Sequence, residues 1–392
     1  MELDAFESGL SDRTTSVAGH EDIRFVDGGG TAPGDRTFRP DIEGLRAVAV
    51  LLVVLYHSGD LHLVGGFVGV DAFFVISGFV ITGVLLRKST STGKPQLLAF
   101  YSHRVLRIVP MATVVIASAM VAERVVFGAA TAAKWADGAK WAALFSANIR
   151  PTFLLGTYWS LAVEEQFYLV YPALLLLLAV FGRRWTFRVK IGVLLGTTIV
   201  ASLTWAVLHP VAAYTSPFGR AWELAVGASI AAATAQLKKL PTLAAAAMTW
   251  CGLIGLIVVA ELMEYTSSYS GTFAVLPVLA AALIIAGGTA APQLGAESVL
   301  KLAPFRWIGR WSYSLYLWHW PVILIAAQHW GYMSGLRKGG LALFSLGLSA
   351  TTYFLIENPI RRSALLTRTP FIGLAFGAVL VASCLAVITL VS

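Results

Sequence analysis

Two neighbouring apolar stretches decide the fold class. Residues 43–60 read EGLRAVAVLLVVLYHSGD, and residues 67–86 read FVGVDAFFVISGFVITGVLL. Each is close to the roughly 20 residues that an α-helix needs to cross about 30 Å of hydrocarbon. Similar blocks recur at 105–122, 160–181, 189–208, 219–236, 242–262, 271–288, 312–330, 338–356 and 370–391. The sequence therefore predicts an all-α polytopic membrane protein with eleven spans.

The composition of the 392 residues supports this class. Apolar residues make up 57% and charged residues 13%, against roughly 25% charged residues in soluble domains. These values exclude a disordered chain and an ordinary soluble enzyme, and an outer-membrane barrel would alternate apolar and polar residues instead. The net charge of +8 does not indicate nucleic acid, because Lys and Arg mark cytoplasmic loops in membrane proteins. Cys251 and Cys384 lie within apolar blocks, so we expect neither a disulfide framework nor a metal site.

The polar residues indicate how the chain is organised. Residues 1–38 carry eight acidic residues and no apolar period, which is typical of a disordered tail. With the N-terminus in the cytoplasm, the inside loops hold 17 Lys and Arg and the outside loops hold 7. The positive-inside rule favours this orientation, and eleven spans then put the C-terminus outside. The semi-polar segment 131–156 is expected to be amphipathic or re-entrant.

The first block carries two ionisable residues, Arg46 and His57, that share a helix face. They are 11 residues apart, which brings them within about 20° around a helix and about 16.5 Å along it. In the predicted orientation Arg46 lies near the cytoplasmic interface and His57 in the outer half of the bilayer. Spacing alone leaves open that Arg46 snorkels to lipid headgroups and that His57 makes an interhelical hydrogen bond. Histidine is also the commonest general base, so a catalytic role is the alternative for His57.

Three carboxylates enter apolar blocks, where each requires a partner. Asp71 lies near the outer end of its block, at a depth comparable with that of His57. We therefore hypothesise that Asp71 orients His57 through a hydrogen bond. Glu164 and Glu165 are adjacent, and successive helical residues diverge by about 100°. We therefore expect them to have different roles, one of which could be that of a charge at a helix N-terminus.

Further charged and aromatic residues mark two more regions. Arg104 and Arg107 project from one face of a helix start; the alternatives are positive-inside anchoring and a phosphate clamp at the cytoplasmic mouth. Another charged pair, in Arg220-Ala221-Trp222-Glu223, opens the block at 219–236. His319 stands beside Pro321, and this pattern indicates a kinked helix that lines a cavity.

Seven motifs in order give the sequence its resemblance to the acyltransferase-3 family. They are Phe38–His57 with its Arg-x10-His signature, Gly65–Thr82, Tyr101–Pro110, Trp159–Tyr171, Gly219–Gly227, Trp311–Pro321 and Glu357–Arg361. The resemblance implies a bundle of about ten helices over residues 39–362, and residues 363–392 are then an additional helix that ends outside. The expected organisation is thus a disordered acidic cytoplasmic tail (1–38), the acyltransferase-3 membrane domain and this eleventh span.

The resemblance also implies an activity. Such proteins are O-acyltransferases of the plasma membrane that take an acyl group, often acetyl, from cytoplasmic acyl-CoA. They transfer it to a hydroxyl of a carbohydrate or glycolipid acceptor on the outer side. Family members with eleven spans commonly continue into an external SGNH-type domain, so the resemblance implies that this domain is missing here or is a separate partner.

Residue roles follow from the same resemblance. His57 is the essential histidine, acting as a general base or as an acyl carrier, and Arg46 is its motif partner, which would hold donor phosphate or close the channel. Arg104 and Arg107 match the positions associated with the acyl donor. One of the carboxylates Asp71, Glu164 and Glu165 would orient the imidazole.

Two other classes of function remain open on the residues alone. Ionisable residues within spans also line the substrate pathways of transporters and flippases, and such a protein would not consume a thioester. A non-catalytic scaffold for an external domain is the third hypothesis, and it predicts that His57 is dispensable.

Overall fold

The structure is a computed structural model that describes residues 39–59, 63–92, 97–180, 185–266, 269–290 and 292–392. The predicted acidic tail lies outside the described residues. Within the described part, the regular secondary structure is helical and no β-strand occurs. The all-α fold class predicted from the apolar blocks is therefore confirmed.

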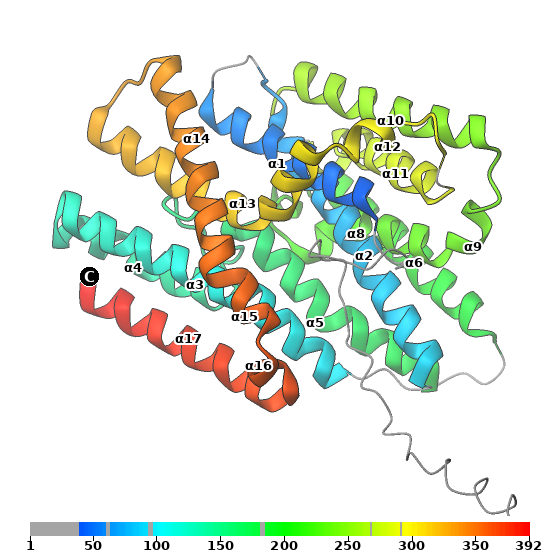
Figure 1. Cartoon of the computed structure of the whole chain (residues 1–392), viewed down its shortest axis with the longest axis horizontal. Coiled ribbons are helices and arrows are strands. Elements are labelled where there is room, and N and C mark those ends of the chain that lie inside the picture. The colour runs from blue at the N-terminus through cyan, green and yellow to red at the C-terminus, as the bar shows by residue number, and fades with distance from the viewer. Residues whose placement is uncertain (1–38, 60–62, 93–96, 181–184, 267–268, 291) are drawn as a thin grey trace, which may run out of the picture. The chain divides into compact units, whose positions relative to one another are not determined.

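A helix coincides with each apolar block (Figure 1). These helices are α1 (Pro40–Ser58), α2 (Gly69–Thr92), α3 (Leu97–Phe127), α5 (Tyr158–Val180), α6 (Phe187–Leu208), α8 (Pro217–Ala232), α10 (Thr242–Leu262), α11 (Val275–Thr289), α13 (Ala303–Trp330), α14 (Gly335–Thr352) and α17 (Pro370–Val391). Shorter helical segments are η1 (Gly66–Val68), α4 (Ala129–Ala143), α7 (Pro210–Ala213), α9 (Thr234–Leu237), η2 (Tyr269–Phe273), α12 (Glu297–Leu300), η3 (Tyr353–Glu357), α15 (Asn358–Arg362) and α16 (Ala364–Arg368).

Eight of the described helices are long and apolar enough to cross a membrane. They correspond to α2, α3, α5, α6, α10, α11, α14 and α17. The three other predicted spans are α1, α8 and α13, and these carry Arg46, Arg220 and His319. The helix α8 has only 16 residues, whereas charged and polar residues interrupt the apolar runs of α1 and α13.

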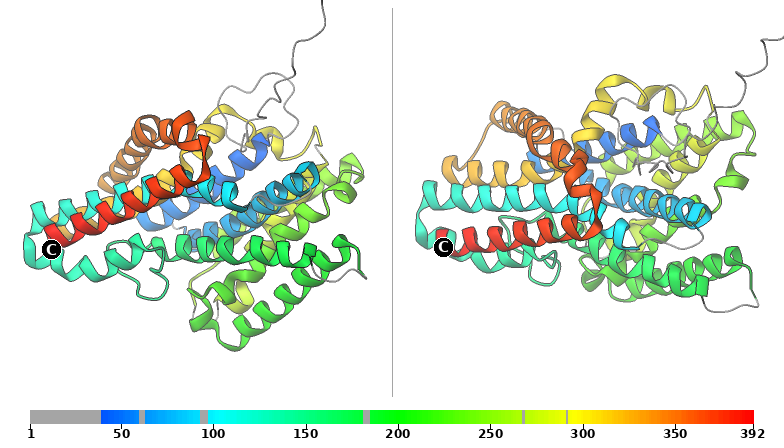
Figure 2. Two further views of the ribbon diagram at one scale, coloured as in Figure 1. Left: turned by 90° about the horizontal axis from the view of Figure 1, so that it is seen from below. Right: turned by 60° about the horizontal axis from the view of Figure 1, so that its bottom comes forward.

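The segment predicted to be amphipathic or re-entrant contains α4. Its buried residues are alanines at helical spacing, including Ala132, Ala136 and Ala139, and α4 packs against α3 and α17. Small side chains on one face of a helix let it approach its neighbours closely. The last helix, α17, runs alongside α3 (red and cyan in Figure 2).

Close helix pairs hold the site together. The most extensive are α1 with α13, α2 with α8, α3 with α17, and α10 with α11. The α2–α8 pair depends on two glycines that face the opposite backbone. A methyl group at Gly78 would overlap the carbonyl oxygen of Leu224, and one at Gly227 would overlap the carbonyl oxygen of Val75.

We expect Gly78→Ala to lower the thermal unfolding midpoint of the purified protein in detergent. The added methyl group must separate α2 from α8, and overpacking of this kind costs about 1–3 kcal/mol. Gly347→Ala in α14 is the matched control, because a methyl group there meets no atom within 4 Å. Alanine has the higher helix propensity, so this control should unfold at the wild-type temperature or slightly above it. Equal midpoints for the two variants would contradict the close α2–α8 contact.

Candidate active site

Two histidines from neighbouring helices meet at the centre of the candidate site. His57 lies in the last turn of α1, and its Nδ1 atom is 3.1 Å from Nε2 of His319 in α13. Nδ1 of His319 lies 3.0 Å from the carbonyl oxygen of Leu315. A carbonyl oxygen only accepts hydrogen bonds, so neutral His319 carries its proton on Nδ1 and accepts at Nε2. Neutral His57 then donates from Nδ1, and its Nε2 atom keeps a lone pair for chemistry.

A cavity of about 250 Å³ lies beside this pair and is called the His57 cavity below. Seven aromatic residues line it together with His57: Tyr56, Phe67, Trp159, Tyr214, Tyr265, Tyr316 and Trp320. The ring of Trp320 is centred 4.6 Å from that of His57, and its indole nitrogen donates to the carbonyl oxygen of Phe153. Aromatic walls around a few polar groups are typical of binding sites for small molecules and substrates.

A second cavity, of about 100 Å³, contains Arg46, Arg104 and Arg107 and is called the arginine cavity. Nε of Arg46 donates to the hydroxyl of Ser312 in α13 over 3.2 Å. Arg46 and His57 therefore both contact α13, as expected of two residues on one face of α1. They line different cavities, so they serve different parts of the site.

The two glutamates of α5 bind Arg104. Its guanidinium lies 2.7 Å from Glu165 and 3.7 Å from Glu164, and it stacks 3.8 Å from the ring centre of Tyr168. Ser77 donates to Glu164 over 2.7 Å. In the structure both carboxylates bind Arg104, and the contact with His57 is made by His319. The hypothesis that Glu164 or Glu165 orients His57 therefore gains no support from these contacts.

The two arginines of the predicted donor motif differ in their surroundings. Arg104 is occupied by two carboxylates. Arg107 lines the same cavity and is half-buried; within the described part of the chain it forms no ion pair shorter than 4 Å, and Glu165 and Glu357 act on it only at longer range. A guanidinium without a carboxylate partner is the better phosphate ligand, since its donors are not already engaged. Arg107 is thus the arginine of this pair that suits an anionic ligand.

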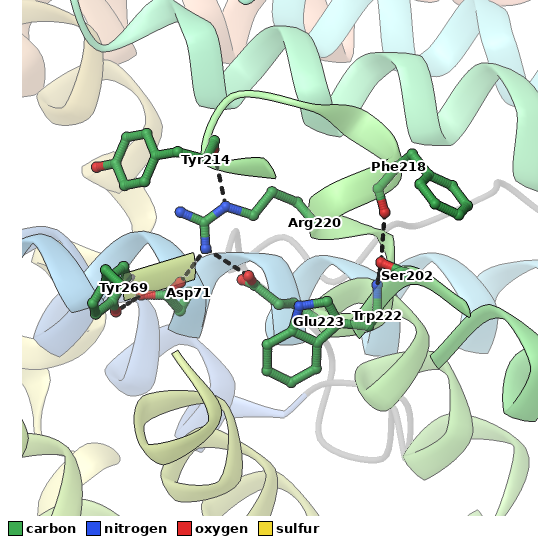
Figure 3. A network of polar contacts seen from close by, with 8 residues as sticks. All are labelled: Asp71, Ser202, Tyr214, Phe218, Arg220, Trp222, Glu223 and Tyr269. Atoms are coloured by element: carbon green, nitrogen blue, oxygen red, sulfur yellow. Dashed lines mark hydrogen bonds and ion pairs between the residues drawn. The ribbon is translucent and has the colours of Figure 1, made fainter. Parts of the chain in front are cut away.

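Asp71 belongs to a buried ionic network with Arg220, Glu223 and Tyr269 (Figure 3). Arg220 donates to Asp71 over 2.8 Å and to Glu223 over 2.6 Å, and all three side chains are at most 1% exposed. The hydroxyl of Tyr269 donates to the second carboxylate oxygen of Asp71. The structure thus pairs Asp71 with Arg220 and Tyr269, and the predicted hydrogen bond from Asp71 to His57 gains no support from these contacts.

This network supports one wall of the His57 cavity. Nε of Arg220 donates to the carbonyl oxygen of Tyr214, and its guanidinium lies 4.9 Å from the ring centre of Tyr214 and 5.7 Å from that of Trp159. Tyr214 and Trp159 both line the cavity. The ionic network of Asp71, Arg220 and Glu223 therefore holds the aromatic side chains of this wall in place.

The partner of His57 was not identified from the sequence. His319 and Pro321 indicated a cavity, but His57 and His319 are 262 positions apart, and the sequence gave no reason to pair them. The available signal was that both histidines occur in blocks with an aromatic neighbour, Tyr56 and Trp320 respectively. Among the described residues, no group of three His, Cys, Asp or Glu side chains is arranged to hold a metal ion.

Comparison with known proteins adds information beyond this geometry. The peptidoglycan O-acetyltransferase OatA of Listeria monocytogenes is 28% identical over 360 residues, which cover 84% of this chain and 56% of that protein. The O-acetyltransferase OatA of Staphylococcus aureus is 29% identical over 357 residues (83% and 57%). The putative peptidoglycan O-acetyltransferase YrhL of Bacillus subtilis is 28% identical over 351 residues (82% and 55%). No solved structure gives a significant match.

The family assignment rests on a match to a family profile. The chain spans a little more than half the length of these curated relatives. The sequence profile of a family described as an acyltransferase domain matches residues 39–388, from the start of α1 into the last turn of α17. The chain therefore belongs to the acyltransferase-3 family.

Proposed function

We propose that this protein is a membrane O-acyltransferase that transfers an acyl group from acyl-CoA to a hydroxyl of a cell-envelope glycan. The observation that carries the proposal is the His57–His319 pair, because it leaves Nε2 of His57 with a lone pair beside a cavity. The Listeria relative is named a peptidoglycan O-acetyltransferase, which supports acetyl as the acyl group and a cell-wall glycan as the acceptor.

In the proposed reaction His57 acts as a general base. Its Nε2 atom takes the proton of the acceptor hydroxyl while the hydroxyl oxygen attacks the carbonyl carbon of the thioester. The carbon–sulfur bond breaks, and the proton passes from His57 to the leaving thiolate. The products are an ester of the acceptor and free CoA. His319 is a positioning residue in this scheme, since it holds the proton of His57 on Nδ1.

The proposed donor site is the arginine cavity. CoA carries phosphate groups, and Arg107 and Arg46 line the cavity with guanidinium groups that bind phosphate through paired hydrogen bonds. Arg104 contributes to the wall through its ion pair with Glu165. The acceptor then binds in the aromatic His57 cavity.

The proposed topology follows the charge of the loops. The loops on the proposed cytoplasmic side hold 17 Lys and Arg, and the loops on the proposed outer side hold 7. This excess supports a cytoplasmic N-terminus with residues 1–38. The arginine cavity then lies on the same side of the plasma membrane. The His57 cavity then faces the outer side. Residues 39–362 form the proposed catalytic membrane unit, residues 363–392 add a span that ends outside, and an SGNH-type domain acts as a further domain or partner.

Binding of acetyl-CoA to the purified protein in nanodiscs tests the donor site. We expect Arg107→Gln to weaken binding measured by calorimetry by about 10- to 100-fold, because a hydrogen bond to a charged group contributes about 1.5–3 kcal/mol. Arg150→Gln is the matched control: it removes the same charge from a side chain that is 67% exposed and lines neither cavity.

The outcomes of this experiment separate the proposals. His57→Ala should bind acetyl-CoA as tightly as the wild type, since His57 is reserved for chemistry. Equal affinities for Arg107→Gln and Arg150→Gln would move the donor site away from Arg107. A folded wild-type protein that binds no acyl-CoA would favour a transporter or a scaffold, because neither consumes a thioester.

A further inference from the structure

The arginine cavity and the His57 cavity meet at a common wall. Of the residues that line them, two belong to both cavities: Val70 of α2 and Tyr316 of α13. The three arginines lie on one side of this wall, and His57 lies on the other. Any group that passes from the first cavity to the second has to pass these two side chains.

Hydrogen bonds hold the Tyr316 side chain in this wall. Its hydroxyl lies 2.6 Å from the hydroxyl of Ser160 and donates to the carbonyl oxygen of Thr157 over 3.3 Å. Ser160 lines the arginine cavity and Thr157 lines the His57 cavity. The hydroxyl is therefore anchored at the start of α5, at the boundary between the two cavities.

Aromatic contacts hold the ring of the same side chain. The rings of Tyr316 and Phe73 form an edge-to-face contact, with the ring centres 6.1 Å apart. The centre of the His319 ring is 5.7 Å from that of Tyr316, because the two residues are three positions apart in α13 and so lie on one side of the helix. The wall thus borders directly on the histidine pair.

We propose that Tyr316, with Val70 opposite, limits the size of the acyl group that this enzyme transfers. This inference rests on the proposed function, in which the donor enters through the arginine cavity. The acyl group leads the pantetheine arm past Tyr316 and then shares a cavity of about 250 Å³ with the acceptor. The Tyr316 ring restricts both its passage and the space left for its chain, so acetyl is accepted and longer acyl groups are rejected.

The experiment measures how the rate depends on the length of the acyl chain. The purified full-length chain in nanodiscs receives acetyl-CoA, butanoyl-CoA or hexanoyl-CoA, with a β-1,4-linked N-acetylglucosamine tetramer as the acceptor probe. Free CoA and acylated probe are quantified by mass spectrometry. The quantity compared is kcat/KM for hexanoyl-CoA divided by kcat/KM for acetyl-CoA.

We expect Tyr316→Ala to raise this ratio by at least about tenfold, since even one methylene changes discrimination by about 10- to 200-fold in a tight apolar site. Tyr316→Phe is the matched control. It keeps the ring and removes both hydrogen bonds, so its ratio should stay at the wild-type value. Val70→Ala widens the wall from α2 and should raise the ratio in the same direction, which provides a test that does not depend on the folding of Tyr316→Ala.

The possible results distinguish the two proposals. A wild type that releases CoA from acetyl-CoA, together with unchanged ratios in the folded variants Tyr316→Ala and Val70→Ala, overturns the role of the wall and leaves the proposed function intact. A ratio raised equally in Tyr316→Phe assigns selectivity to the hydrogen bonds and also overturns the size limit. A folded wild type that releases CoA from none of the three thioesters contradicts the proposed function itself.

Discussion

Replacing His57 with glutamine is expected to lower the rate of acyl transfer by about 100- to 10,000-fold, the usual contribution of a general acid or base. The glutamine amide has a similar reach, but it cannot take the proton of an acceptor hydroxyl. Binding of acetyl-CoA should remain, because the proposed phosphate ligands, Arg46 and Arg107, line the other cavity. The measurement is the initial rate of CoA release and of acylation of the N-acetylglucosamine tetramer.

Three further variants make this result specific to the histidine pair. His329→Gln changes a histidine at the far end of α13 that contacts Phe127, and it should keep the wild-type rate. His319→Gln retains an acceptor oxygen for the proton on Nδ1 of His57, whereas His319→Leu removes it. The glutamine variant should therefore be the more active of the two. A wild-type rate in His57→Gln would exclude His57 as the general base and leave that role to another residue.

Replacing Arg220 with methionine is expected to destabilise the protein by about 3–5 kcal/mol, because removal of one partner leaves buried charge without compensation. Asp71 and Glu223 are both at most 1% exposed and would lose the guanidinium between them. The aromatic wall of Tyr214 and Trp159 would also lose its support. The expected result is a strongly lowered thermal unfolding midpoint and a low yield of folded protein.

A combined variant tests the electrostatic origin of this loss. Arg220→Met together with Asp71→Asn and Glu223→Gln removes all three charges and keeps the side chains close to their original size. It should unfold at a higher temperature than Arg220→Met alone. If Arg220→Met unfolds at the wild-type temperature, the network does not stabilise the α2–α8 pair. If the combined variant is no more stable than Arg220→Met, packing rather than charge accounts for the loss.

The sequence was sufficient for the fold class and for features within one helix. Apolar blocks near 20 residues predict helices, because the hydrocarbon thickness of the bilayer sets that length. The shared face of Arg46 and His57 follows from the helical repeat alone, and both residues contact α13 in the structure. The charged pair at the start of the block at 219–236, Arg220 and Glu223, was likewise identified from the sequence alone.

The partners of the ionisable residues could not be predicted from one sequence. Asp71 and Arg220 are 149 positions apart, and Arg104 and Glu165 are 61 positions apart. Their contacts depend on which helices pack together, and that choice is made by surfaces such as the glycines that join α2 to α8. The expected depth in the bilayer narrows the choice of partner for an ionisable residue, but several residues share the same expected depth. Asp71 was for this reason assigned to His57 instead of to Arg220.

The long separation of Asp71 and Arg220 has a consequence for biosynthesis. Asp71 is translated first, and 149 further positions follow before Arg220 emerges. At about 5–20 residues per second this takes roughly 7–30 s. During that interval α2 carries a carboxyl group that lacks its arginine, and the helix gains its full stability in lipid only when α8 arrives. Ribosome stalling between the two helices would therefore leave an insertion intermediate with an uncompensated acidic residue, the kind of substrate that membrane quality-control proteases remove.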